Sequence, residues 1–211
     1  MQARVTAVVE IVVFFGLILL DIWVVQPMDR PALDLSLRLA VGALLLLAPW
    51  AHGDSRQRLG WRLDTLGAAL ARLLPVSLLV VVGATAAGWF LQSFDPPESA
   101  AVTLGTYLAW ALLQQYALQS IVLLRLEDSG LRRAAPLAAA TLFAIAHAPN
   151  PGLVILTFLG GLLWCSTFRR HPNLLAVAIS HALLAVVVVS TMPHEITGGL
   201  RIGPAYLEGR R

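Results

Sequence analysis

The sequence contains no lysine, a single cysteine and few charged residues. Charged side chains make up 13% of its 211 residues, apolar side chains make up 58%, and the mean hydropathy is +0.76. Because about a quarter of the residues of a soluble domain are charged, this composition excludes an ordinary soluble domain. It predicts a polytopic membrane protein. The lone Cys165 excludes an internal disulfide.

The absence of lysine means that all fifteen basic residues are arginines. They lie in short clusters between apolar runs, a distribution typical of residues that set membrane topology. The formal net charge of +3 is therefore not taken as a sign of nucleic-acid binding, and we expect no nucleic-acid partner.

Seven apolar runs have, or come near, the length of a spanning helix. The first lacks a small-residue cleavage site at its end and is expected to be a retained anchor. Between the second and third, arginines alternate with Leu and Trp, which predicts an interfacial helix before the third span. We therefore expect an all-α polytopic membrane protein with about seven transmembrane helices. The runs cover residues 5–25, 35–50, 76–91, 102–126, 134–148, 153–168 and 174–190.

The chain is expected to form a single membrane domain, 1–211. Residues 1–101 supply N-terminal spans, 102–190 form the core, and 191–211 form a polar tail without an assigned fold. With seven spans, ten of the fifteen arginines lie on the side of the N-terminus. The positive-inside rule then predicts a multi-pass protein of the cell membrane with a cytoplasmic N-terminus. The five arginines on the other side are Arg30, Arg38, Arg201, Arg210 and Arg211.

Three glutamines and two histidines lie inside the apolar runs: Gln114, Gln115, Gln119, His147 and His181. Counting residues from the nearest arginine expected on the cytoplasmic side, at about 1.5 Å per helical residue, gives their depth in the membrane. Gln114, His147 and His181 each lie roughly 15 to 20 Å deep by this count. Such groups are costly in lipid unless they meet partners. We expect them to share one buried site near the bilayer midplane. The alternative is that they serve only as hydrogen-bond links between helices.

Spacing along each helix refines this expectation. Gln115 and Gln119 are four residues apart and share a face, as do Phe143 and His147. Gln114 is turned about 100° from Gln115, so one member of the pair is expected to point at the site while the other braces it.

At these residues the chain resembles the CAAX-protease and bacteriocin-processing (CPBP) family of intramembrane endopeptidases. The family pattern is Glu-Glu-x-x-x-Arg on one helix, Phe-x-x-x-His on the next, and His-x-x-x-Asn or Asp on a later one. The matching stretches are QQYALQ from Gln114 to Gln119, FAIAH from Phe143 to His147, and HALLA from His181 to Ala185. The resemblance covers about residues 104–189.

The resemblance implies peptide-bond hydrolysis inside the membrane, with membrane-embedded or prenylated peptides or proteins as substrates and membrane lipid as surroundings. It implies that Gln114, Gln115, His147 and His181 stand at catalytic positions. Gln119, Phe143 and Ala185 stand at positioning or structural positions. The chain departs from the family because Gln replaces both glutamates and the arginine, and Ala185 replaces the final Asn or Asp. A carboxamide cannot act as the general base.

Three functions remain compatible with this pattern. The first is an endopeptidase in which His147 acts as the base. The second is an inactive pseudoprotease that binds membrane-embedded or lipidated peptides, and the third is a small polar-solute transporter or membrane assembly subunit. No cofactor is expected: family members are often described as metalloproteases, but two histidines without a carboxylate make a poor zinc site.

Overall fold

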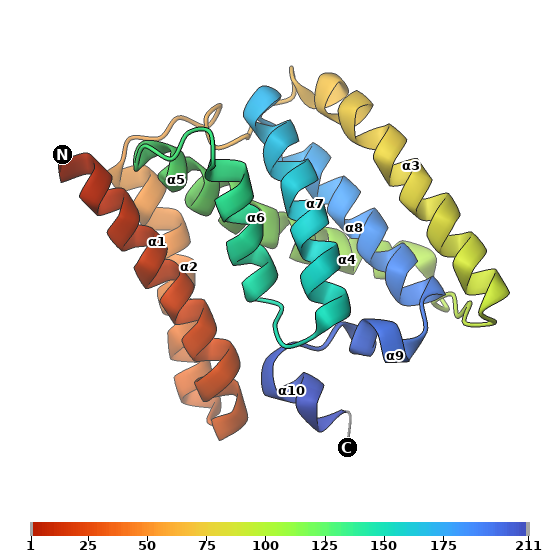
Figure 1. Ribbon diagram of the computed structural model, residues 1–211. Helices are drawn as coiled ribbons and strands as arrows, with labels where there is room; N and C mark the ends of the chain where they lie inside the picture. The colour runs from red at the N-terminus through yellow and green to blue at the C-terminus, as the bar shows by residue number, and fades with distance from the viewer. Residues whose placement is uncertain (1, 210–211) are drawn as a thin grey trace.

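The computed structural model describes residues 2–209, which are helices joined by turns without any strand. Arg210 and Arg211, two of the five arginines counted on the side opposite the N-terminus, lie outside this range. Figure 1 shows the long helices running between two ends of the molecule, with the shorter α9 and α10 gathered at one of them. The elements are α1 Gln2–Leu20, η1 Asp21–Val25, η2 Gln26–Met28, α2 Pro31–Ala51, α3 Leu66–Phe90, α4 Ala100–Gln115, η3 Tyr116–Leu123, α5 Leu124–Asp128, α6 Ala135–Ile145, α7 Pro151–Arg170, α8 Leu174–Thr191, α9 His194–Thr197, η4 Gly198–Leu200 and α10 Gly203–Glu208.

Six helical segments are long and apolar enough to cross a membrane, and α6 is a shorter apolar helix. The all-α polytopic fold is therefore confirmed. The expected fifth span, 134–148, does not cross on its own, because the 11 residues of α6 cover only about 16 Å of a hydrocarbon core about 30 Å thick. The chain instead turns back after His147, and α7 begins at Pro151.

The expected interfacial helix before the third span is not formed. Residues 52–65 are turns and irregular chain, and α3 begins at Leu66. Gly60 has a φ of +84°, and a Cβ there would lie 2.5 Å from the ring of Phe168. The start of α8 binds the backbone of this loop. Leu174 N donates to Gly60 O at 3.0 Å, and Asn173 Nδ2 donates to Arg62 O at 2.5 Å. These contacts fold the segment over the ends of the helices.

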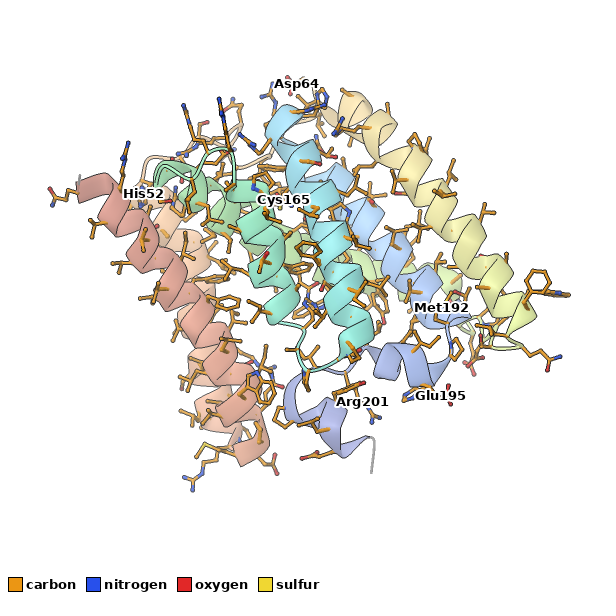
Figure 2. The ribbon with its side chains drawn as sticks, in the orientation of Figure 1. His52, Asp64, Cys165, Met192, Glu195 and Arg201 are labelled. Atoms are coloured by element: carbon orange, nitrogen blue, oxygen red, sulfur yellow. The ribbon has the colours of Figure 1, made fainter. Side chains whose placement is uncertain are left out.

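The N-terminus and the α2–α3, α5–α6 and α7–α8 connections form one end of the molecule, here called the arginine-rich end (Figure 1). In Figure 2, His52 and Asp64 lie at this end, whereas Glu195 and Arg201 lie at the opposite end. The tail, for which no fold was predicted, forms α9, η4 and α10. Asn150 holds the tail against the start of α7. The Nδ2 of Asn150 donates to Thr197 O at 2.7 Å and to Arg201 O at 3.0 Å.

A buried arginine joins three segments at the arginine-rich end. Arg125 is fully buried, and its guanidinium donates to Glu10 at 2.9 Å, to Asp128 at 2.8 Å, and to the buried Asp54. Arg58 also binds Asp54 and lies 2.6 Å from Asp128. Glu10 therefore has an interhelix role, and this cluster fixes the end of the span that carries the three glutamines.

Candidate active site

A cavity of about 430 Å³ lies between α3, α4, α7, α8 and the tail segment near η4. Four of the seven residues expected at the site line it: Gln114, His147, His181 and Ala185. They come from α4, the turn after α6, and α8. The expected meeting of these three parts of the chain is therefore found.

Gln115 and Gln119 do not line the cavity but lie behind His181. Both amides are fully buried. Gln119 Nε2 donates to Gln115 Oε1 at 2.9 Å, and Gln115 Nε2 is 3.2 Å from His181 Nδ1. Of the adjacent pair, Gln114 thus faces the cavity and Gln115 braces the histidine.

His147 is held by its own helix. Its Nδ1 lies 2.7 Å from the carbonyl oxygen of Phe143. The Phe143 ring packs edge-on against both histidines, with centroid distances of 4.7 Å to His147 and 6.0 Å to His181. Phe143 therefore packs against both imidazoles and restricts their orientations.

These contacts assign a different tautomer to each neutral imidazole. A carbonyl oxygen only accepts, so His147 Nδ1 carries the proton and Nε2 keeps a free lone pair. An amide nitrogen only donates, so with the amides oriented as in the structure His181 Nδ1 accepts and its Nε2 carries the proton. One ring offers a proton acceptor and the other a hydrogen-bond donor.

The sequence reading missed the aromatic support of His181. Trp164, only 3% exposed, stacks on His181 with ring centroids 4.4 Å apart and an interplanar angle of 29°. Its Nε1 donates to Ser180 Oγ at 3.1 Å, and Ser180 is 3.1 Å from Ser77 Oγ on α3. The sequence signal that could have revealed it is a tryptophan inside an apolar helix, four residues after a glycine. In the structure a Cβ at Gly160 would lie 2.7 Å from the Trp164 ring, so the glycine makes room for the indole.

The fourth span is not a continuous α-helix beside the site. After Gln115 it passes into the π-helical segment η3, which carries the buried Gln119. Insertions of this kind occur frequently at functional sites because they rotate the following side chains. Here Ser120 Oγ donates to Leu59 O at 3.0 Å, and Tyr116 Oη donates to Leu45 O at 3.2 Å. Contacts with α2 and the 52–65 loop thus hold the segment in place.

The residues around the cavity do not fit a resident metal ion. Within residues 2–209, no group of three His, Cys, Asp or Glu side chains is close enough to hold one. The polar side chains lining the cavity are two imidazoles, the amide of Gln114, the indoles of Trp110 and Trp164 and the hydroxyls of Tyr107 and Thr157. Zinc sites in proteins are built from at least three imidazole, thiolate or carboxylate ligands, so this donor set does not match one.

Comparison with known proteins gives one match. Residues 96–187, a little under half of the chain, match the family described as type II CAAX prenyl endopeptidase Rce1-like. No curated protein and no solved structure matches the chain. The matched segment contains all three motifs, with Gln114, Gln115, Gln119, His147 and His181. Residues 96–187 are thus similar to the type II CAAX prenyl endopeptidase Rce1-like family, in agreement with the resemblance drawn from the three motifs.

Proposed function

We propose that the protein is an intramembrane endopeptidase of the CAAX type in which His147 takes the role of the missing glutamate. The similarity of residues 96–187 to the type II CAAX prenyl endopeptidase Rce1-like family supports peptide hydrolysis as the class of reaction. The observation that carries the proposal is the pair of imidazoles on one cavity, with an acceptor on His147 and a donor on His181.

The proposed reaction is hydrolysis of a peptide bond. His147 Nε2 takes a proton from a water, whose oxygen adds to the peptide carbonyl carbon while Gln114 orients the water. The carbonyl oxygen becomes negative and accepts a hydrogen bond from His181 Nε2. His147 then gives the proton to the peptide nitrogen, and the C–N bond breaks to leave a carboxyl group and an amine. The proposal involves no metal step, in keeping with the donor set.

A specific observation favours a second candidate, a pseudoprotease that binds peptides without cutting them. Not one of the residues lining the cavity is a carboxylate, although the family uses glutamate at the positions of Gln114 and Gln115. The cavity and its apolar lining would still accept a membrane-embedded or lipidated peptide.

The decisive experiment uses purified protein in lipid nanodiscs with two fluorescent peptide sets, one prenylated and one apolar and unmodified. Mass spectrometry detects the products, and fluorescence anisotropy detects binding. We expect products from at least one set. Binding without products over many hours would instead establish the pseudoprotease, and neither binding nor products would rule out both functions.

A carboxylate restored at the cavity should raise the rate. We expect Gln114→Glu to increase cleavage at neutral pH by about tenfold to hundredfold, because a carboxylate is a stronger base for water than an amide. Gln115→Glu is the matched control. A carboxylate only accepts, so His181 would have to carry its proton on Nδ1 and lose the Nε2 donor, and cleavage should fall by about tenfold or more. The opposite order of the two variants would contradict these roles.

We also propose that the N-terminus and the arginine-rich end face the cytoplasm of a cell membrane. Cysteines placed one at a time at Ser129 and Ser93, in a Cys165→Ala background, would test the orientation. The α5–α6 turn should react with a membrane-impermeant thiol reagent only after cells are opened. The α3–α4 connection should react in intact cells, and the reverse pattern would invert the topology.

A further inference from the structure

Among the arginines of residues 2–209 that are not solvent-exposed, Arg72 alone has a buried nitrogen without a hydrogen-bond partner. Arg72 Nε on α3 is buried and has no hydrogen-bond partner, and the side chain forms no ion pair within residues 2–209. Leaving a buried donor of a charged group unpaired costs more than losing an ordinary hydrogen bond. The arginines that do pair with carboxylates are Arg38, Arg58, Arg62, Arg125 and Arg169.

Arg72 lies on the edge of α3 that faces the cavity. Val76 and Val80, which line the cavity, follow Arg72 at intervals of four residues and therefore share its side of the helix. Figure 1 shows α3 beside α7 and α8, the two helices that carry Trp164 and His181. Arg72 is thus one turn beyond the cavity wall, toward the arginine-rich end.

The hydrogen bond between Ser77 and Ser180 fixes the height of Arg72 relative to the site. Ser180 is the residue before His181, so Ser77 lies level with this histidine. Arg72 is five residues closer to the arginine-rich end, about 7.5 Å along the helix. Its side chain leans further in that direction, because Cβ atoms tilt toward the N-terminus of a helix.

The cavity itself offers nothing that would neutralise an anion, since its lining contains no charged side chain. A peptide that ends in a free carboxylate therefore needs a cation nearby. Arg201 lies between the lining residues Leu200 and Ile202, but its guanidinium is directed at Gly209 of the tail. Of the two, only Arg72 is placed on a cavity-facing helix edge with an unused donor.

We infer that Arg72 binds the terminal carboxylate of the peptide whose scissile bond lies between His147 and His181. The inference rests on the proposed function and adds a specificity determinant to it. In a CAAX sequence, three residues follow the cysteine, and three extended residues span about 10 Å. This length is comparable to the rise of about 7.5 Å from the level of His181 to Arg72 together with the lean of the arginine side chain in the same direction. Arg72 would therefore select peptides whose chain end lies three residues beyond the scissile bond.

The test compares two prenylated peptides of identical sequence, one ending in a free acid and the other in a neutral amide, in nanodiscs. We expect wild-type protein to bind and cleave the acid about tenfold to hundredfold better, the range for hydrogen bonds to charged groups. Arg72→Gln should reduce this ratio to about one, and Arg72→Lys should restore part of it. Arg201→Gln, which removes the cation at the opposite end, should leave the ratio unchanged.

Three results would separate the possible failures. Equal treatment of acid and amide by wild-type protein would overturn the inference, even if both are cleaved. An equal loss for both peptides in Arg72→Gln would also overturn it, because Arg72 would then not distinguish the carboxylate from the amide. Binding that prefers the acid through Arg72, but without any cleavage, would support this site while ruling out the proposed endopeptidase.

Discussion

Replacing His147 with alanine should lower single-turnover cleavage by about 10²- to 10⁴-fold, the usual contribution of a general base. Its Nε2 is the proton acceptor left free beside the cavity, because Nδ1 is engaged by the Phe143 carbonyl. Both motif glutamates are replaced by amides, and the other imidazole lining the cavity, His181, accepts from Gln115 through Nδ1 and presents a donor instead. The rate should be measured at saturating peptide by product mass spectrometry, with binding followed separately by anisotropy.

The matched control is His171→Ala. His171 ends α7 in the connection to α8 and lies outside the cavity lining, so its loss should leave cleavage within about twofold of wild type. If His147→Ala kept full activity with unchanged binding, His147 would not be the base. If it lost binding in equal measure, its role would be to shape the cavity wall.

The sequence was sufficient to predict the polar site because burying amides and imidazoles in lipid requires partners. Gln114, His147 and His181 were estimated to lie at one depth, and all three line one cavity. The 100° offset between Gln114 and Gln115 also predicted that only one would face the site. These inferences depend on helix periodicity and on the cost of unpaired polar groups, which are local properties of the chain.

Other features depend on contacts that are not local and could not be deduced. In the sequence Trp164 cannot be distinguished from the other apolar residues of its run. Its role depends on the packing of α7 against α8, which stacks its ring on His181. The tail is polar and Gly-rich, so it has no periodicity of its own, and its fold comes from the hydrogen bonds of Asn150. The loop over residues 52–65 resembled an interfacial helix because its Arg and Leu pattern fits both a membrane surface and the end of a bundle.

The second large effect concerns stability. Arg125→Met should destabilise the protein by about 3–5 kcal/mol, the cost of breaking a buried ion pair by removing one partner. Asp54 is fully buried, while Glu10 and Asp128 retain 16% and 29% of their side-chain exposure. Without the guanidinium, the buried Asp54 keeps Arg58 as a partner, but three carboxylates are then gathered around an apolar side chain. Equilibrium unfolding in mixed micelles should measure the loss.

Arg38→Met provides the comparison, since Arg38 and its partner Asp34 have side-chain exposures of 59% and 27% and such pairs contribute at most about 1 kcal/mol. Adding Asp54→Asn to Arg125→Met should recover part of the lost stability, because Asp54→Asn removes the buried charge that Arg125→Met leaves poorly paired. Equal losses for Arg125→Met and Arg38→Met would mean that the cluster adds little. A loss confined to Arg125 would show that one guanidinium joins α1, the 52–65 loop and the glutamine-bearing span. The α-helical hydrogen-bond pattern of that span is interrupted by the π-helical segment η3, which lies between Gln115 and Arg125. The ion pairs of Arg125 then fix the far end of the span and so help to hold Gln115 against His181.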